Sequence, residues 1–394
     1  MAEIAPDPPE PAASPDESRE ESIGLAMPET GAAEEELVLA VLRSGSLALG
    51  PMLDRFEQAL AERLGVDDVV ATSSGTAALH LGVRLQGWTS GDEVVTTPLS
   101  FVASANCLLY EDVTPVFCDV DPQTLTMDAD AAAAAVSSRT AGILPVHIFG
   151  YPVDLRGLRA FADSNGLSVL EDACQALGAV DAAGVSVGAS GDPSAFGFYP
   201  NKQITTGEGG ALVPGSADAA ARVRSERNQG RAPDMGEMAH DRLGFNYRMS
   251  DLNAAVGVGQ LDRLDGLLAA RERVATAYTE ALSGIDGIEC LIANRPPERR
   301  SWFVYVVQLP EGADRDAVIS ELAGRGIQTK AYLPCIHLYP HFREQFGFKG
   351  GEFPNAERFS ARALALPFHT SLSESQVKRI VAALADALGQ PFSP

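Results

Sequence analysis

Lysine is scarce in this chain of 394 residues. All but four of its 30 basic residues are arginine, and the four lysines are Lys202, Lys330, Lys349 and Lys378. An amine can lose its proton and attack a carbonyl, whereas a guanidinium stays protonated. Lys202 follows the aromatic pair Phe198-Tyr199 and precedes a glycine-rich turn, where desolvation would lower its pKa. Lys202 is therefore a candidate nucleophile, although a bias against lysine codons that left it on a surface loop explains this feature equally well.

Positive charge as a whole is scarce. The chain has 30 basic and 53 acidic residues and a net charge of -23. Part of this excess lies in the N-terminal region through Glu36, but the rest of the chain is acidic too. Such a charge opposes binding to nucleic acid or to an anionic membrane. We therefore expect neither as a partner.

Long apolar runs and closely spaced cysteines are also missing. No uninterrupted apolar run reaches the roughly 18 residues that span a bilayer, and the N-terminus lacks the basic and apolar regions of a secretory signal. The five cysteines form no Cys-x-x-Cys pair, which argues against a disulfide framework or a zinc site and for free thiols in a reducing compartment. These features predict a cytoplasmic protein.

The sequence does contain a regular alternation of short β-branched runs with helical stretches. Residues 1–22 are rich in Pro, Ala, Asp, Glu and Ser and are predicted to form a disordered tail without a chemical role. The alternation predicts a large α/β domain at residues 23–265, with a mostly parallel sheet and helices on both faces. A long helical segment from Met249 to about Leu282 leads into a smaller α+β domain at residues 266–394.

Three features of the large domain carry polar or reactive groups. The turn Ser73-Ser-Gly-Thr76 follows a predicted strand and begins a helix, where backbone N–H groups and the helix dipole suit a phosphate. Simple helix capping is the alternative for this turn. Asp172 ends another hydrophobic strand and is expected to point into the crevice at the carboxyl ends of the strands, unless it caps a helix. Lys202 is the third feature.

Together these groups match what pyridoxal 5′-phosphate needs. Its aldehyde requires a lysine, its ring nitrogen requires an acid, and its phosphate requires a helix terminus. A flat apolar group that stacks on the ring would complete the site, and Phe101 is a candidate for it.

Further motifs extend this pattern over about nine tenths of the chain. The motifs are Arg43–Pro51, Ser73–Leu79, Gly91–Ala103, Pro145–Pro152, Glu171–Gln175, Phe198–Lys202, Gly207–Gly210 and Gly244–Arg248. In this order they resemble the DegT/DnrJ/EryC1/StrS family. The resemblance implies a sugar aminotransferase of fold type I that depends on pyridoxal phosphate.

The resemblance implies a role for each residue around the cofactor ring. Lys202 forms the Schiff base and shuttles the proton, and Asp172 pairs with the pyridine nitrogen. Gln175 contacts the phenolic side of the ring, and Phe101 stacks on it. Family members that act as dehydratases carry a histidine at the lysine position, so Lys202 indicates a transaminase.

The phosphate contacts are implied in the same way. Ser74, Gly75 and Thr76 hold the phosphate, and Asn246 reaches it from the partner subunit, so the resemblance implies a homodimer with shared active sites. Many members carry a serine phosphate ligand where this chain has Gly197. The absence of this serine removes one hydrogen bond to the phosphate, worth about 0.5–1.5 kcal/mol.

Three more residues are candidates for contact with the substrate. His147 ends a predicted strand and lines the crevice, or it is a structural, hydrogen-bonded histidine. Arg248 offers its guanidinium to a carboxylate or diphosphate, with an intramolecular ion pair as the alternative. His337 lies in a segment that resembles the family's small-domain loop over the substrate. No metal site is expected from His337 and His341, because Pro340 breaks the helix that would align them.

The reaction that the resemblance implies is ping-pong transamination. The amino donor is L-glutamate, and the acceptor is a keto group on a nucleotide-activated sugar for surface polysaccharide or secondary-metabolite biosynthesis. An aminotransferase that acts on a keto-cyclitol or another antibiotic precursor is an alternative that the sequence does not separate. A non-catalytic regulator that senses pyridoxal phosphate or a sugar nucleotide is a second alternative, disfavoured by the complete set of cofactor residues.

Overall fold

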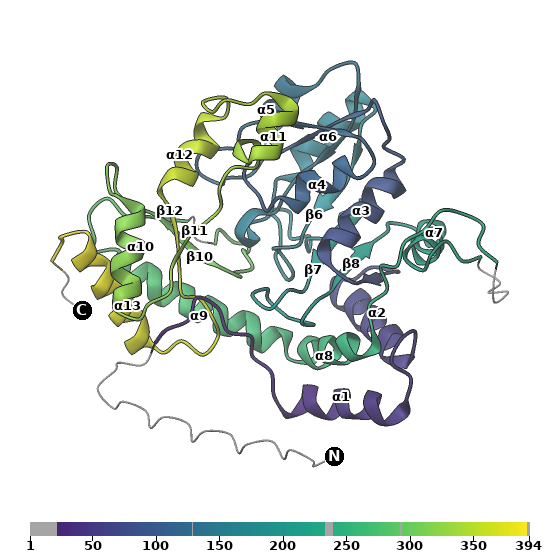
Figure 1. Cartoon of the computed structure of the whole chain (residues 1–394), viewed down its shortest axis with the longest axis horizontal. Helices are drawn as coiled ribbons and strands as arrows, with labels where there is room; N and C mark the ends of the chain where they lie inside the picture. The colour runs from purple at the N-terminus through teal and green to yellow at the C-terminus, as the bar shows by residue number, and fades with distance from the viewer. Residues whose placement is uncertain (1–21, 128, 233–238, 292–293, 392–394) are drawn as a thin grey trace, which may run out of the picture.

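The computed structural model describes residues 22–127, 129–232, 239–291 and 294–391. All of the predicted N-terminal tail except Ser22 lies outside these ranges. The described chain forms a large α/β part and a smaller part that is built on a second sheet (Figure 1). None of the helices in these ranges is long and apolar enough to cross a membrane.

The strands of the large part form one continuous sheet. They are β1 (Val70–Thr72), β2 (Glu93–Thr96), β3 (Thr114–Phe117), β4 (Thr140–Leu144), β5 (Ser168–Val169), β6 (Glu171–Asp172), β7 (Ser194–Gly197) and β8 (Gly210–Val213). Their order is β3-β2-β4-β5 in one half and β6-β7-β8-β1 in the other. The halves are joined because the N–H of Leu170 donates to Ile143 and the N–H of Asp172 donates to Pro145. β8 runs antiparallel to its neighbours β1 and β7, whereas the other pairs of strands are parallel, which confirms the predicted mostly parallel sheet.

Helices cover both faces of this sheet. They are α1 (Ala32–Ser44), α2 (Pro51–Leu64), α3 (Gly75–Gln86), α4 (Ala103–Leu109), α5 (Ala129–Ala135), α6 (Leu155–Asn165), α7 (Ala217–Arg227) and α8 (Asp251–Asp262). Phe196 of β7 shares a buried cluster with Phe56 of α2, whereas its neighbour Ala195 shares one with Leu79 of α3. Successive strand residues point to opposite faces, so both faces of β7 are buried under helices, as predicted.

The predicted helical segment from Met249 to about Leu282 consists of two helices. α8 ends at Asp262, the backbone of Arg263 after it is not helical (φ -108°, ψ 3°), and α9 (Leu264–Leu282) begins at the next residue. The guanidinium of Arg263 donates to Glu34 of α1 (2.9 Å). Such a contact joins residues far apart in the sequence, so the apolar periodicity of the segment could not reveal it.

The smaller part contains an antiparallel sheet in the order β11-β12-β10-β9. Its strands are β9 (Glu289–Cys290), β10 (Tyr305–Gln308), β11 (Lys330–Ala331) and β12 (Ala363–Leu366), and its later helices are α10 (Arg315–Gly324), α11 (Pro340–Phe346), α12 (Pro354–Arg362) and α13 (Glu374–Ala387). Ile23 pairs with Ile327, so the start of the described chain lies against this part. The proposed division of the chain near residue 265 stays a prediction.

Candidate active site

Lys202 lies on a turn that follows β7, beyond the carboxyl end of that strand. Its N–H donates to the carbonyl of Tyr199 (2.9 Å), and its Nζ lies 4.3 Å from the centre of the Phe303 ring. Burial lowers the pKa of Lys202, whereas electrostatic interactions with Cys174 and Asp172 raise it. Lys202 is thus half-buried with its amine beside an aromatic ring, which does not fit a lysine on an open surface loop.

Asp172 is the last residue of β6 and is buried. Its Oδ2 accepts a hydrogen bond from the hydroxyl of Ser104 in α4 (2.6 Å), and its Oδ1 accepts one from the N–H of Cys174 (3.0 Å). A turn follows Asp172, not a helix, so the helix-cap alternative does not apply. The hydrogen bonds hold the carboxylate in one orientation at the end of the strand.

The turn before α3 has the geometry of an anion site. The Oγ of Ser74 accepts from the N–H of Ala77 (3.1 Å), so this serine is the helix N-cap. A Cβ on Gly75 would lie 2.9 Å from the Sγ of Cys174, and one on Gly210 would lie 2.4 Å from the carbonyl of Ser74. Only glycine lets the start of α3 lie this close to β8 and to the turn after β6. Thr76 follows in the first turn of α3, where free N–H groups and the helix dipole favour a phosphate.

Cys174 connects the three predicted features. Its Sγ lies beside Gly75, and burial, together with the charge of Asp172, raises the pKa of its thiol while Lys202 lowers it. The phosphate turn, the carboxylate and the amine therefore surround one side chain. The ring of Phe101 is 58% exposed just before α4, which leaves an apolar face open to a planar ligand. These residues fit pyridoxal phosphate in the chemistry of each donor.

Gln175 and His147, two further predicted site residues, are both buried. The Oε1 of Gln175 accepts from the N–H of Phe149 (2.7 Å). The Nδ1 of His147 accepts from the N–H of Val153 (3.1 Å), and its Nε2 lies 3.0 Å from Glu171. Both ring nitrogens of His147 thus have partners within the protein, which favours the structural alternative for this residue.

Asn246 and Arg248 lie on a segment beside the start of α3. Asn246 is exposed, and Arg248 is half-buried with its Nη1 donating to the side-chain oxygen of Asn228 (3.0 Å). The carbonyl of Tyr247, between them, accepts from the N–H of Ser73 (2.8 Å). The segment is therefore tied to the phosphate turn of its own subunit, while the Asn246 side chain faces outward.

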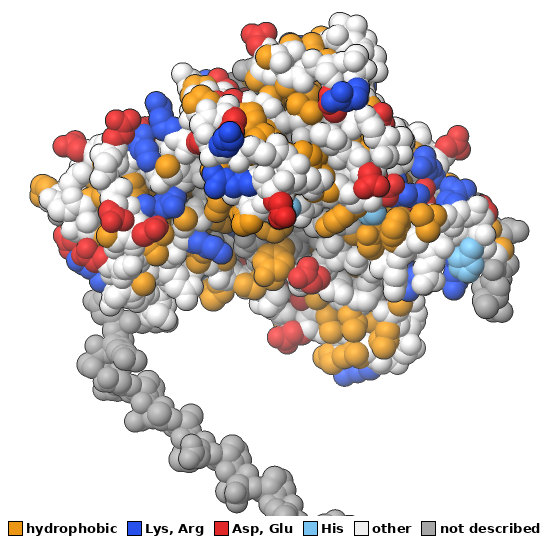
Figure 2. Space-filling model, turned by 45° about the horizontal axis from the view of Figure 1, so that its top comes forward, with side chains coloured by type: hydrophobic (Ala, Val, Ile, Leu, Met, Phe, Trp, Pro, Cys, Tyr) orange, Lys and Arg blue, Asp and Glu red, His pale blue; other side chains and the backbone are white. Residues whose placement is uncertain are grey.

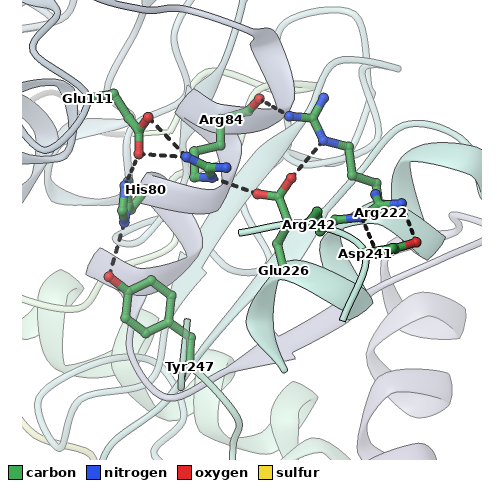
Figure 3. Close-up of polar contacts among 8 residues, drawn as sticks. All are labelled: His80, Arg84, Glu111, Arg222, Glu226, Asp241, Arg242 and Tyr247. Carbon is green, nitrogen blue, oxygen red and sulfur yellow. Dashed lines mark hydrogen bonds and ion pairs between the residues drawn. The ribbon is translucent and has the colours of Figure 1, made fainter. Parts of the chain in front are cut away.

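A network of polar side chains holds this segment against α3 (Figure 3). The hydroxyl of Tyr247 lies 3.0 Å from the Nδ1 of His80, whose Nε2 lies 2.8 Å from Glu111. Arg84 donates to both oxygens of Glu111 (3.0 Å each) and, through Nε, to Glu226 (2.7 Å). Because α3 carries both His80 and the phosphate turn, the network fixes the segment relative to that turn.

His337 is fully buried in the smaller part of the molecule. Its Nε2 lies 3.0 Å from Glu357, and its ring packs edge-on against Phe353. His337, Glu352 and Glu357 place ligand atoms within 4.8 Å of one another. The carboxylate of Glu352 already accepts from backbone N–H groups, including that of Lys349 (2.7 Å). The structure thus gives His337 a partner in the protein, and its contact with substrate stays a prediction.

Two neighbours of the predicted residues escaped the sequence analysis. Ser104 of α4 orients Asp172, and its hydroxyl lies 2.7 Å from that of Ser100, which precedes the helix; no pattern in the sequence marks this serine. Phe303 lies under the amine of Lys202, and no local pattern marks it because it comes from a distant part of the chain.

Comparisons with known proteins extend over almost the whole chain. The profile of the DegT/DnrJ/EryC1/StrS aminotransferase family matches residues 28–385. GDP-perosamine synthase of Caulobacter vibrioides is 36% identical over 369 residues, which cover 93% of this chain and 98% of that protein. Spore coat polysaccharide biosynthesis protein SpsC of Bacillus subtilis is 34% identical over 383 residues, covering 94% and 98%. The crystal structure of the aminotransferase TlmJ from Streptoalloteichus hindustanus has a TM-score of 0.87 at 33% identity and covers 94% of this chain and 99% of that one.

This likeness includes both sheets and the turns between them, not one motif alone. Solved structures similar to this chain include a pyridoxal phosphate form. The predicted fold type I is confirmed by these neighbours, and so is the predicted cofactor. The chain therefore belongs to the DegT/DnrJ/EryC1/StrS aminotransferase family and is a pyridoxal-phosphate-dependent aminotransferase.

Proposed function

We propose that this protein transfers an amino group from L-glutamate to a keto group of a nucleotide-activated sugar. The observation that carries the proposal is the arrangement of Lys202, Asp172 and the turn at Gly75 around the side chain of Cys174. The names of the two sequence relatives, a GDP-perosamine synthase and a spore coat polysaccharide protein, support a sugar acceptor.

Each side chain has a separate role in this proposal. Bound pyridoxal phosphate supplies an aldehyde for the amines and a ring that delocalises electrons. Lys202 holds the cofactor and then moves a proton as general base and acid, for which a lowered pKa of the amine is favourable. Asp172 keeps a proton on the ring nitrogen, while Gln175 and Phe101 orient the ring. Ser74, with Gly75 and Thr76 beside it, binds the phosphate.

A homodimer with shared sites belongs to the same proposal. Asn246 is exposed beside the phosphate turn of its own subunit, where a partner's cofactor could be reached. Large apolar side chains are exposed on and after α1 and near Asn246, namely Leu39, Leu42, Leu47, Leu49 and Leu243. Figure 2 shows apolar side chains gathered in patches on the surface of the molecule. Exposed apolar patches mark interaction surfaces. We propose that a second copy of this acidic, cytoplasmic protein is the partner that binds there.

Of the three residues predicted to touch the substrate, Arg248 is the best placed to bind an anionic group of it. Its guanidinium binds the neutral amide of Asn228, so its positive charge is available to a carboxylate or a diphosphate. His147 and His337 already have partners in the protein. The proposal therefore assigns anion recognition to Arg248 before either histidine.

The test has two stages that separate the alternatives. Loaded protein is first mixed with L-glutamate, and release of 2-oxoglutarate together with loss of the cofactor's visible colour is expected; a sensing regulator would show neither. The aminated enzyme is then offered a panel of nucleotide-linked 3-keto and 4-keto sugars and keto-cyclitols. Turnover with a cyclitol alone would replace the sugar acceptor by the alternative.

A further inference from the structure

Lys202 lies on a turn, so neither a helix nor a strand fixes its backbone. Its carbonyl accepts a short hydrogen bond from the Nη2 of Arg271 in α9 (2.6 Å). The Nη1 of the same guanidinium donates to the carbonyl of Phe303 (3.3 Å), whose ring lies 4.3 Å from the lysine Nζ. One side chain thus contacts both the lysine and the residue whose ring lies beside its amine.

Arg271 is an unusual residue to find at this place. Its side chain is only 5% exposed, and its Nε has no hydrogen-bond partner. Within the described residues Arg271 forms no ion pair, and burial lowers its pKa to about 10. A buried charge without a counter-ion destabilises the fold, so we expect this arginine to have a function that outweighs its cost in stability. Its guanidinium donates to the carbonyls of Lys202 and Phe303 and also lies 5.8 Å from the centre of the Phe368 ring.

The planar guanidinium explains why an arginine serves here. Two Nη groups at a fixed separation can bind two carbonyls at once, which a single ammonium group does less well. α9 also packs against α13 in the smaller part of the molecule. Arg271 therefore connects the turn of Lys202 to the segment that carries Phe303.

We infer that Arg271 is a positioning residue for Lys202, because its guanidinium binds the carbonyls of Lys202 and Phe303 and so holds the amine against the Phe303 ring. The inference rests on the proposed role of Lys202 as the residue that holds the cofactor. The other groups that face the amine are Asp172 and Cys174, and neither contacts Arg271 directly in the bonds described above.

Because the chain has only four lysines, the reactivity of Lys202 can be measured separately from that of the other three. Full-length protein is acetylated over a series of pH values, and mass spectrometry follows Lys202 beside the exposed Lys330, Lys349 and Lys378, which serve as internal standards. Pyridoxal phosphate is expected to protect Lys202 and none of the other three. Absence of this protection would refute the proposed role of Lys202 itself.

The second stage compares two arginine variants without cofactor. Arg271→Met removes the contacts to Lys202, whereas Arg300→Met removes an equally buried guanidinium that packs on the rings of Tyr151 (4.9 Å) and Trp302 (4.6 Å). In Arg271→Met, water reaches the amine, and the apparent pKa of Lys202 is expected to rise by about one unit. In Arg300→Met it is expected to stay as in the unmodified protein, although both variants lose stability.

Turnover provides a second readout. A misplaced lysine in Arg271→Met is expected to reduce kcat by about 10–100-fold, with little change in KM for glutamate. If cofactor still protects Lys202 but both variants show the same Lys202 pKa, the inference is overturned. Should Arg271→Met fail to fold, Arg271→Lys, which can bind one carbonyl only, is expected to give a smaller rise in the same direction; no rise at all would overturn the inference.

Discussion

Lys202 is the residue on which the chemistry depends. Lys202→Ala is expected to bind pyridoxal phosphate through the phosphate turn but to lack the colour of a lysine-linked cofactor. Turnover is expected to fall by at least about 10²–10⁴-fold, the usual contribution of a general acid–base residue. Absorption spectra and a glutamate assay measure both effects, with the exposed Lys378→Ala as the matched control. A coloured, active Lys202→Ala protein would contradict the assignment.

Gly197 occupies the position at which the resemblance to the family predicts a serine phosphate ligand in many members. A Cβ there would lie 3.5 Å from the side chain of Cys174 and 3.6 Å from the Cα of Gly75, which are ordinary van der Waals distances. Gly197→Ser is therefore expected to fold and to add a phosphate hydrogen bond of about 0.5–1.5 kcal/mol. Titration with pyridoxal phosphate should then give a Kd lower by about 2–10-fold.

Gly75→Ser is the matched comparison for that variant. Its Cβ would lie 2.9 Å from the Sγ of Cys174, so it is expected to weaken cofactor binding. Equal effects of the two substitutions would show that Gly197 does not face the phosphate.

At the scale of elements, the network between α3 and the segment of Asn246 has a measurable strength. Tyr247→Phe removes the hydroxyl that bonds to His80 (3.0 Å) and leaves a buried ring nitrogen without a partner. The free energy of unfolding is expected to fall by about 1–3 kcal/mol, measured by urea denaturation. Tyr110→Phe is the control, because its ring also contacts His80 but is 53% exposed. Equal stability of the two variants would contradict a role for the Tyr247 hydroxyl.

At the scale of the whole molecule, the proposed shared sites predict complementation. Lys202→Ala and Asn246→Ala homodimers are each expected to be impaired, the first through the lysine and the second through the partner's phosphate contact. After the two are unfolded and refolded together, random pairing yields about a quarter of the sites intact, as expected for a symmetric dimer. Activity of the mixture that does not exceed the sum of the separate variants would argue against shared sites.

Buried histidines predict how stability depends on pH. Burial lowers the pKa of His80, His337 and His369 in the folded protein, whereas the unfolded value is about 6.5. As the pH falls through about 6.5, the unfolded chain binds more protons than the folded one, so the free energy of unfolding decreases. Urea denaturation at about pH 8, 7, 6 and 5 measures this loss. A free energy of unfolding that is constant over this range would contradict the prediction.

The carboxylate of Glu111 predicts a second loss of stability at lower pH. Burial raises the pKa of Glu111, but hydrogen bonds from His80 and Arg84 outweigh burial and leave the pKa lowered. Its contribution is present above the unfolded value of about 4.3 and is lost as the pH falls through the folded value. The acid limb of the same denaturation series should therefore begin below about pH 4.3.

The sequence by itself determined the class of the molecule and its cofactor. Alternating strands and helices are local patterns, and so are the turn at Gly75, the strand-end Asp172 and the isolated Lys202, because each depends on neighbours along the chain. Their order was enough to identify the family, and the comparisons confirm it. What only the tertiary structure decided are contacts between distant residues: Ser104 with Asp172, Arg263 with Glu34, and Arg271 with Lys202.

Whether a side chain is buried is one property that the sequence did not reveal, as two histidines illustrate. Sequence alone treated His147 and His337 as candidates for substrate contact, because a histidine at a strand end or in a loop has the same letters whether it is open or enclosed. In the structure His147 has two protein partners and His337 has one, which favours a structural role for His147, while contact of His337 with substrate stays a prediction. Such partners arise when separate segments of the chain come together, and no local pattern in the sequence encodes that.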